Sequence, residues 1–248
     1  MCLAGPVATK PLTLTIIRNE VDSGPGRLLA WAELAGVTVD LRKADDGDEI
    51  PSSATELDAL IMLGGGFLPD ADDGRPWLAA ERALALDCLD AGVPMLGICL
   101  GAQLLAHVGG GRVEPDYGTP EKGVTTLTPQ PAGANDPLFA AFSAPVVGIE
   151  SHRDQITRLP EGAPLLMSSM HCRNQSFRLG DVAWATQWHP ECSAERVAGW
   201  DEDYLRRLGL DPAEVKQTAR DHDDELERTW RAFFERFVAV AQARSEPR

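Results

Sequence analysis

The sequence predicts an α/β fold: a mostly parallel open sheet with helices on both faces, a smaller antiparallel strand region and a helical C-terminal tail. Two observations predict it. Between residues 12 and 110, short apolar segments rich in β-branched residues alternate with helix-like segments, as in parallel βαβ units. Between residues 123 and 189, strand-like segments follow one another with short turns and few helices, which indicates antiparallel pairing.

The elements of the parallel region follow from apolar runs and from the residues that end them. The expected strands are apolar runs that close in polar residues or glycine, at 12–19, 37–44, 57–66 (strand, then a glycine loop) and 93–99. The expected helices have helical apolar spacing and end at glycine, at 26–36, 77–92 and 100–110.

The second half continues with strand-like segments and then changes character. The expected strands are 123–129, 145–151, 164–171, 176–180 and 181–189. From about residue 194 the chain is polar, charged and helical, and no internal repeat or linker interrupts it. We therefore expect a single domain over residues 1–248, with a helical tail over about 194–248.

Composition narrows the classes of function. The 248 residues hold 38 acidic and 23 basic side chains, a net charge of -15, which argues against binding to a phosphate backbone. The opening MCLAGPVATK is too short and too weakly apolar for a signal peptide, and no apolar run reaches the length of a membrane span. Five irregularly spaced cysteines fit a reducing compartment better than a disulfide framework. We expect a cytoplasmic protein that binds neither nucleic acid nor membrane.

Cys99 lies in GICLGAQ (97–103), between an expected strand and an expected helix. Such a turn projects its residue from the carboxyl edge of the sheet, where ligands bind in open α/β folds. Gly97 and Gly101 leave room for the tight backbone, as in the G-x-S-x-G elbow of hydrolases. The helix N-terminus would favour the thiolate and offer N–H groups to an oxyanion. A buried structural thiol is the competing interpretation, because free cysteine is often buried.

His189 and Glu191 form a candidate base and orienting pair in QWHPE (187–191), at the end of an expected strand. Two residues apart on a strand, their side chains would emerge on the same face. A carboxylate there can bind one imidazole nitrogen and leave the other for a sulfur nucleophile. Taken alone, a histidine at a strand end is more often structural or solvated. Its combination with Cys99 favours a catalytic role.

PMLGICLGAQLLA together with QWHPE resembles the triad-type (class I) glutamine amidotransferases, in particular free-standing proteins similar to the amidotransferase half of GMP synthase. The resemblance runs from about residue 12 to about residue 192 and includes PWLAAE (76–81), SHRDQI (151–156) and HCRNQSFRLG (171–180). It implies a cysteine-dependent glutaminase reaction through a γ-glutamyl thioester. Cys99 would be the nucleophile, His189 the general base and acid, and Glu191 the residue that orients it.

The resemblance also implies an oxyanion hole made by two backbone N–H groups, from Leu100 and from a glycine of LGGGF (63–67). The spacing to PWL favours Gly65, with Gly66 as the alternative. The proline that follows the glycine pair in the family is absent here. A flexible turn is the plainer interpretation of three glycines.

The same resemblance implies contacts to the substrate. Gln103, one helical turn after Cys99, matches a glutamine that helps to bind substrate, although a surface glutamine is the plain alternative. SHRD (151–154) matches a segment that holds the amino-acid end of glutamine, so Arg153 and Asp154 are implied contacts. Many relatives carry glycine where this chain has Arg153, and the guanidinium would select the substrate or else point to solvent.

Other chemistry receives less support. His171, Cys172, His189 and Cys192 fit no standard zinc spacing, so we expect no metal and no organic cofactor. His107, on an apolar helix, is expected to be a core histidine. The candidate roles are an ammonia-producing subunit that serves a separate synthase, a stand-alone γ-glutamyl hydrolase that releases an amine, or a non-catalytic binding protein. The sequence contains no phosphate-binding loop of the G-x-x-x-x-G-K-[ST] type that would indicate a synthase domain.

Overall fold

The computed structural model describes residues 11–245. Cys2 and the MCLAGPVATK segment lie outside the described residues. Within residues 11–245, the main sheet has nine strands in the order β2-β1-β3-β4-β11-β10-β9-β6-β7. In chain order these strands are β1 (Thr13–Arg18), β2 (Thr38–Lys43), β3 (Ala59–Met62), β4 (Met95–Ile98), β6 (Glu121–Pro129), β7 (Val146–His152), β9 (Leu165–Ser168), β10 (Ser176–Leu179) and β11 (Ala183–Thr186).

The sheet divides into a parallel and an antiparallel half, which confirms the predicted fold class. Strands β2, β1, β3, β4 and β11 pair in parallel. Strands β11, β10, β9, β6 and β7 pair in antiparallel fashion. A second, two-stranded antiparallel sheet joins β5 (Arg112–Glu114) and β8 (Gln155–Arg158), neither of which the sequence pattern predicts. Strand β11 ends at Thr186, earlier than the expected 181–189.

Helices flank the sheet and form the tail. They are α1 (Leu28–Leu34), α2 (Trp77–Ala91), α3 (Leu100–Val108), α4 (Ala194–Ala198), α5 (Glu202–Arg207), α6 (Pro212–Asp221) and α7 (Asp223–Ser245). Short 3-10 turns occur at Val21–Ser23, Ala44–Asp46, Ala54–Glu56 and Pro131–Asn135. Among the residues described, no helix is long and apolar enough to cross a bilayer.

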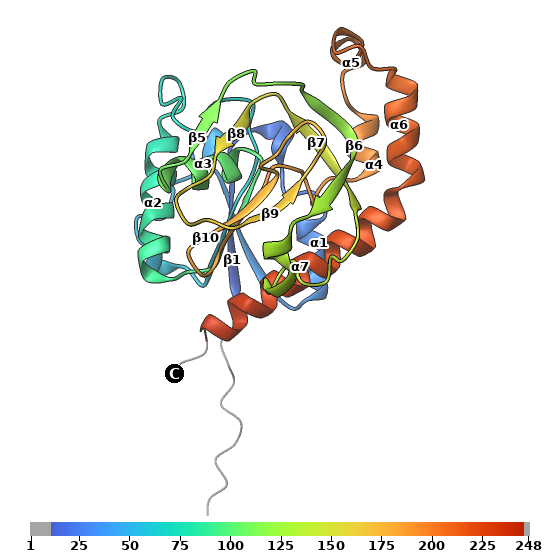
Figure 1. The fold of residues 1–248 in the computed structure, drawn as a ribbon. Helices are drawn as coiled ribbons and strands as arrows, with labels where there is room; N and C mark the ends of the chain where they lie inside the picture. The colour runs from blue at the N-terminus through green and yellow to red at the C-terminus, as the bar shows by residue number, and fades with distance from the viewer. Residues whose placement is uncertain (1–10, 246–248) are drawn as a thin grey trace, which may run out of the picture.

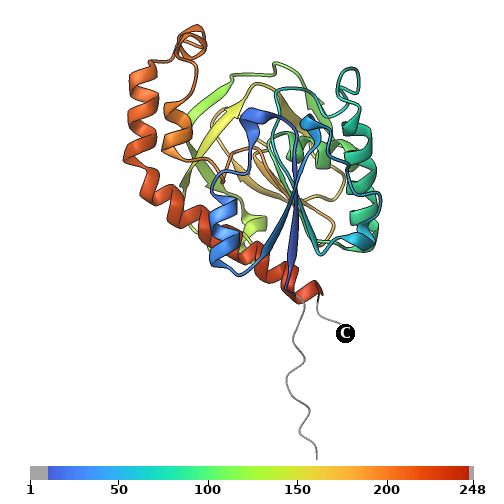
Figure 2. The same ribbon diagram turned by 180° about the vertical axis from the view of Figure 1, so that it is seen from behind.

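Two hydrophobic cores lie on the two faces of the sheet. Helices α2 and α3 cover one face and helices α1 and α7 the other, where α1 packs beside α7 (Figures 1 and 2). Helix α7 buries Trp230, Phe233, Phe234 and Phe237 against the sheet. Burying each of these rings contributes about 1.5–3 kcal/mol, so the C-terminal helix is part of the core rather than an appendage.

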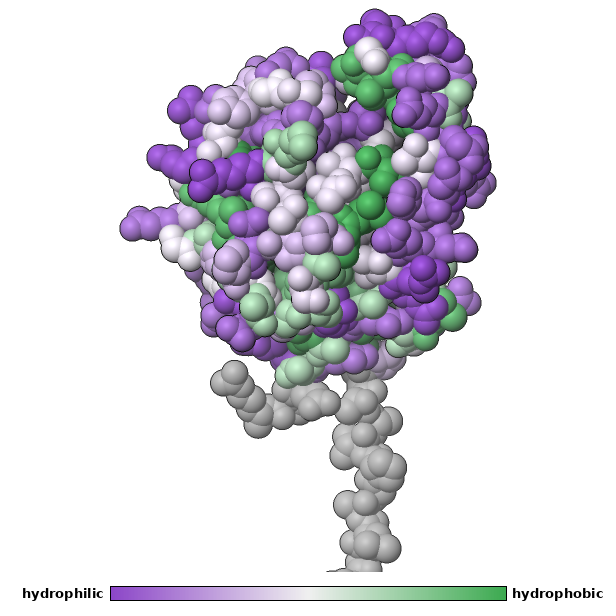
Figure 3. Space-filling view, turned by 45° about the vertical axis from the view of Figure 1, so that its right-hand side comes forward, coloured by the Kyte–Doolittle hydropathy of each residue, from purple (hydrophilic) through white to green (hydrophobic). Residues whose placement is uncertain are grey.

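The segment α4–α6 rises beside β6, with α4 and α6 in contact and α5 at its far end (Figure 1). Helices α4 and α6 contribute Ala194, Val197 and Ala219 to the core on the face that α1 and α7 cover. The face drawn in Figure 3 is mainly hydrophilic. The lobe at upper right, which α5 and the top of α6 form, is purple along its outer edge and carries a hydrophobic (green) patch on its inner side. The lobe therefore presents polar groups outward, while its inner side faces the end of the sheet.

His107 differs from the expectation. Helix α3 buries residues 100–106, but His107 lies in its last turn and is exposed, so it is not a core histidine. The neighbouring Val108 packs against the core, so His107 lies on the solvent-facing side of this turn.

Candidate active site

Cys99 is the single residue between strand β4 and helix α3. Its φ of 53° and ψ of -104° are uncommon for a residue with a side chain. The Cys99 N–H donates to the Thr186 carbonyl at 2.8 Å, and the Cys99 carbonyl accepts from the Gln103 N–H at 3.0 Å. Hydrogen bonds on both sides thus hold the strained residue at the carboxyl end of the sheet, a combination typical of functional sites.

The two glycines around Cys99 are required by close backbone contacts. A Cβ on Gly97 would collide with the Gly101 carbonyl, and a Cβ on Gly101 with the Met62 carbonyl of β3. The strand–turn–helix bend therefore packs backbone against backbone. This agrees with the room that the sequence pattern assigns to both glycines.

His189 and Glu191 lie in the turn after β11. The His189 N–H donates to the Ile149 carbonyl of β7 at 2.8 Å, which fixes the turn against the antiparallel half of the sheet. The adjacent Trp188 is fully buried, with its ring centre 5.1 Å from that of Trp230 in α7. The side chains of His189 and Glu191 meet because of this turn. They do not alternate along a strand as expected, since β11 ends at Thr186.

The imidazole of His189 is held between a carboxylate and the thiol. Its Nδ1 lies 2.8 Å from Glu191 Oε1, and Glu191 is 1% exposed. Its Nε2 makes no hydrogen bond of ordinary geometry within residues 11–245, and Cys99 is close enough to act on it electrostatically. Burial lowers the pKa of His189, but Glu191 and Cys99 together raise it above the ordinary value. The arrangement favours a charged imidazole.

The glycine loop of residues 64–66 lies over Cys99 and His189. A Cβ on Gly64 would lie 3.5 Å from Cys99 Cβ and 3.2 Å from His189 Cε1. The Gly66 N–H is already bound to Glu20 Oε2 at 2.9 Å. In the described part of the chain the Gly65 N–H has no hydrogen-bond partner, which favours Gly65 over Gly66 as an oxyanion donor. Leu100 is the first residue of α3, where backbone N–H groups have no partner within the helix.

A cavity of about 180 Å³ joins Cys99 to all three residues that the resemblance assigns to substrate contacts. Gln103 is buried there, and its Nε2 donates to the Asp154 carbonyl at 3.2 Å. Asp154 also accepts the Asp116 N–H at 3.0 Å through its side chain. Arg153 lies at the rim, with its side chain 51% exposed and Nη1 3.5 Å from Asp116 Oδ1.

A larger cavity of about 680 Å³ lies on the other side of Cys99 and includes His189. The inner side of the α4–α5 segment supplies part of its wall, including Trp200 and Tyr204. Lys122 lines both cavities. Sequence reasoning missed these three residues, because no local motif marks them and only the tertiary fold brings the tail over Cys99.

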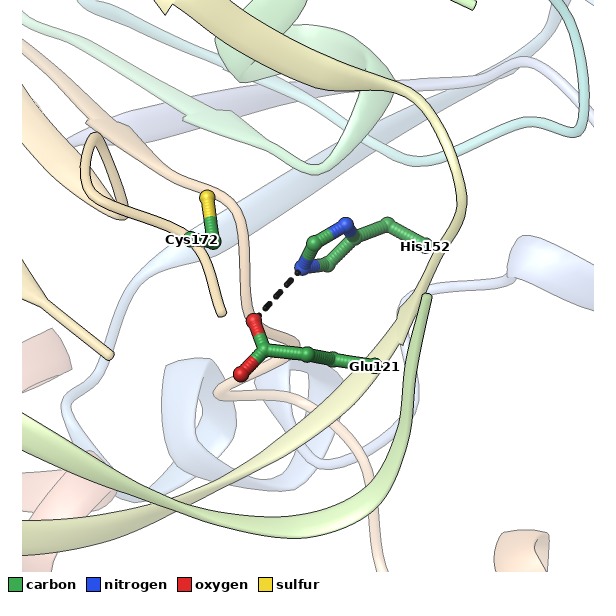
Figure 4. Close-up of side chains that lie close together, drawn as sticks. All are labelled: Glu121, His152 and Cys172. Carbon is green, nitrogen blue, oxygen red and sulfur yellow. Dashed lines mark hydrogen bonds and ion pairs between the residues drawn. The ribbon is translucent and has the colours of Figure 1, made fainter. Parts of the chain in front are cut away.

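A second Cys–His–Glu group lies nearby and is made of Cys172, His152 and Glu121 (Figure 4). His152 Nε2 lies 3.2 Å from Glu121 Oε2, since the two residues face each other across β6 and β7. Cys172 is fully buried and lines neither cavity, and burial raises the pKa of its thiol far above the ordinary value. Cys172 is therefore poorly placed to attack a substrate, in contrast to Cys99.

The ligand atoms of this second group lie within 4.8 Å of one another, which makes it a candidate metal centre. The Glu121 oxygens, however, already accept hydrogen bonds from Ser169 at 2.7 and 2.9 Å and from Gln175 at 2.7 Å. Burial lowers the pKa of His152, but Glu121 and Glu150 raise it more, to about 10. A protonated imidazole has no lone pair for a metal, so the group fits an internal hydrogen-bond network better than a metal centre.

Comparisons with known proteins agree with this geometry. The family model described as glutamine amidotransferase class-I matches residues 27–199. The chain is 32% identical over 186 residues to the glutamine amidotransferase-like protein YfeJ of Salmonella typhimurium, covering 73% of this chain and 76% of that protein. It is 31% identical over 163 residues to a glutamine-hydrolyzing GMP synthase subunit of Halobacterium salinarum, covering 64% and 78%. A glutamine amidotransferase structure from Thermotoga maritima superposes with a TM-score of 0.83 at 25% identity, covering 92% of this chain and 99% of that one.

Proposed function

Because the chain belongs to the class-I glutamine amidotransferase family, we propose that it hydrolyses the side-chain amide of glutamine through a γ-glutamyl thioester on Cys99. The observation that carries the proposal is the position of Cys99. Cys99 lies on a strained turn where two cavities meet, beside His189. Glu191 holds the Nδ1 atom of this histidine.

The first half-reaction forms the thioester. The Cys99 thiolate attacks the side-chain carbonyl carbon, and the oxyanion is received by the N–H groups of Gly65 and Leu100. When the intermediate collapses, the carbon–nitrogen bond breaks and protonated His189 gives its proton to the leaving nitrogen. Ammonia leaves, and the γ-glutamyl group stays on sulfur. The raised pKa of His189 supports its role as the proton donor in this step.

The second half-reaction restores the enzyme. Neutral His189 takes a proton from water, the resulting hydroxide attacks the thioester carbonyl, and the carbon–sulfur bond breaks. Glutamate and the Cys99 thiolate are the products, with His189 again protonated. Glu191 holds the imidazole throughout and stabilises its charged form. These steps use side chains and backbone of this chain and need no metal or organic cofactor.

Substrate placement follows from the smaller cavity. Gln103, Arg153 and Asp154 line it together with Cys99, so the amino-acid end of glutamine would lie there. His189 lines the larger cavity and not the smaller one. The leaving nitrogen would therefore enter the larger cavity, where the proton donor lies.

The fate of the leaving nitrogen distinguishes two versions of this function. An ammonia-delivery subunit requires a separate synthase as partner, as the name of the Halobacterium relative indicates for that protein. A stand-alone γ-glutamyl hydrolase requires room for a larger amine, and the cavity of about 680 Å³ beside His189 provides it. A reducing, cytoplasmic setting stays a prediction, supported by the four free cysteines among residues 11–245.

A labelling experiment tests the proposal. The glutamine analogue diazo-oxo-norleucine should modify Cys99 before the other cysteines, and purified protein should release glutamate from glutamine or from a γ-glutamyl amide. Absence of both a Cys99 adduct and glutamate release would support the third role, a binding protein on the same fold.

A further inference from the structure

Lys122 is a partly buried cation that lines both cavities. Its Nζ donates to Ser151 Oγ at 2.5 Å, since Lys122 and Ser151 face each other across β6 and β7. The same nitrogen lies 3.9 Å from the ring centre of Trp200. Within residues 11–245 no carboxylate forms an ion pair with Lys122, and its electrostatic partners are the thiols of Cys99 and Cys192.

A partly buried cation without a carboxylate partner loses part of its hydration, so a counter-charge that reaches it is favourable. Burial lowers the pKa of Lys122 accordingly. The other cavity cation that lies near the reacting groups, Arg196, is occupied: it donates to the carbonyls of Gly24 and Asp22 and lies 3.7 Å from Glu191 Oε1. Arg207 also lines the larger cavity, but it is exposed to solvent, with its guanidinium carbon 5.6 Å from the ring centre of Tyr204. Lys122 is thus the partly buried cation of this site, among the described residues, that is available to an anionic group of a substrate.

The size of the larger cavity exceeds what ammonia requires. On the same measure of cavity volume, a single water-sized molecule needs about 10–15 Å³. The cavity beside His189 holds about 680 Å³, and Trp200 and Tyr204 give its wall aromatic surface. A leaving amine with a hydrocarbon body would use this space and this surface.

We propose that Lys122 binds the carboxylate of the leaving amine, so that the preferred substrates are γ-glutamyl amino acids; this inference rests on the function proposed above. In a γ-glutamyl amino acid the leaving nitrogen is an α-amino nitrogen, and its carboxylate is only two bonds away. A cation that lines the same two cavities as Cys99 is placed to meet that carboxylate as the nitrogen leaves. Glutamine offers no such group, and a polyamine would bring a second positive charge toward Lys122.

The overall reaction is a hydrolysis. The Cys99 thiolate displaces the amino acid, whose nitrogen takes the proton of His189, and water then cleaves the thioester. One γ-glutamyl amino acid and one water give glutamate and one free amino acid, with no oxidant or other co-reactant.

The experiment compares three substrates: glutamine, γ-glutamyl-phenylalanine and the C-terminal amide of the same dipeptide. The wild type should hydrolyse the dipeptide with a kcat/KM at least about tenfold above that of its amide, because only the dipeptide carries the carboxylate. In Lys122→Met this ratio should fall to near one, since the variant removes the charge and keeps an apolar stem. Lys122→Arg should restore most of the ratio.

Lys216→Met is the matched control. Lys216 also forms a polar contact, with Glu202 at 2.8 Å, but it lies outside both cavities. Its substitution should leave the dipeptide-to-amide ratio unchanged. Thermal melting and Cys99 alkylation identify any variant that fails to fold, and the wild-type comparison of dipeptide and amide is decisive even then.

Two results would overturn the inference. A wild-type ratio near one would show that no group recognises the leaving carboxylate. An equal loss on all three substrates in Lys122→Met would show that Lys122 serves the Cys99 thiolate or the glutamyl end instead. Failure of the proposed function is a different result, in which the wild type hydrolyses none of the three and Cys99 forms no adduct.

Discussion

His189 Nδ1 lies 2.8 Å from Glu191 Oε1, although only Pro190 separates the two residues and neither belongs to a strand. Residues at the start of α1 hold the turn that carries His189 and Glu191 in place. The Glu191 carbonyl accepts the Arg27 N–H at 3.0 Å, and Gly26 packs so closely that a Cβ there would collide with the same carbonyl. The start of α1 therefore fixes the carboxylate that orients the histidine.

Glu191→Gln should reduce kcat less than His189→Ala. Glutamine keeps an oxygen for Nδ1, whereas alanine removes the proton shuttle; we expect losses of about 10–10³-fold and of at least about 10³-fold. Because Glu191 raises the pKa of His189, the pKa of that histidine should also fall in Glu191→Gln. Steady-state rates on one γ-glutamyl substrate and an NMR titration of His189 provide the two measurements. If His189→Ala retained full activity, the base would have to lie elsewhere, with His152 the first residue to test.

Cys99→Ser should abolish hydrolysis, while Cys172→Ser should retain most of it. Both cysteines lie near a histidine and a glutamate, but only Cys99 lines the cavities. Iodoacetamide followed by peptide mapping should modify Cys99 first in the wild type. Preferential alkylation of Cys88 or Cys172, or inactivity of Cys172→Ser in a folded protein, would contradict the assignment of the nucleophile.

Gly101→Ala should destabilise the protein by about 2–4 kcal/mol, as overpacked backbone sites do. The added Cβ would collide with the Met62 carbonyl, and neither backbone segment can move without disturbing β3 or α3. Gly199→Ala is the matched control, because its Cβ would lie 3.4 Å from the nearest atom and its φ is -81°. Urea denaturation of both variants measures the difference, and equal midpoints would argue against the tight elbow.

Glu81→Gln should stabilise the protein at pH 8 and have little effect near pH 4. Burial raises the pKa of Glu81 to about 8, with one oxygen bound to Asn19 Nδ2 at 3.2 Å. The folded state thus keeps a proton that the unfolded chain releases above about pH 4.5, so this group's contribution to stability falls between about pH 4.5 and 8. The Glu81→Gln substitution removes this pH dependence of the free energy of unfolding.

Thermal melting across this pH range measures the Glu81 effect. The expected gain at pH 8 is on the order of 1–3 kcal/mol. Glu56→Gln, on the exposed 3-10 turn Ala54–Glu56, serves as control and should not change with pH in this way. A parallel pH profile of Glu81→Gln and wild type would show that Glu81 ionises normally.

The local sequence determined those features that depend on neighbours in the chain. Alternating apolar runs and glycine stops predicted every strand of the main sheet and the helices α1, α2 and α3. The elbow at Cys99 was predictable because the collisions that require Gly97 and Gly101 involve backbone segments of adjacent βα units. The pairing of His189 with Glu191 was predicted as well, since the two residues are so close in sequence that many local conformations bring them together.

The tertiary structure alone decided what meets across the fold. Strands β5 (Arg-Val-Glu) and β8 (Gln-Ile-Thr-Arg) hold one apolar residue each, so no apolar run marks them in the sequence, and they pair with each other in a separate small sheet. Lys122 in β6 and Trp200 in the C-terminal tail belong to no common sequence motif. They come into contact because the buried rings of α7 pack the tail against the sheet. The turn at Cys99 and the contact between His189 and Glu191 could be predicted from the sequence because local backbone geometry produces them. The larger cavity beside them could not be predicted, because its walls come from segments that long-range hydrophobic packing brings together.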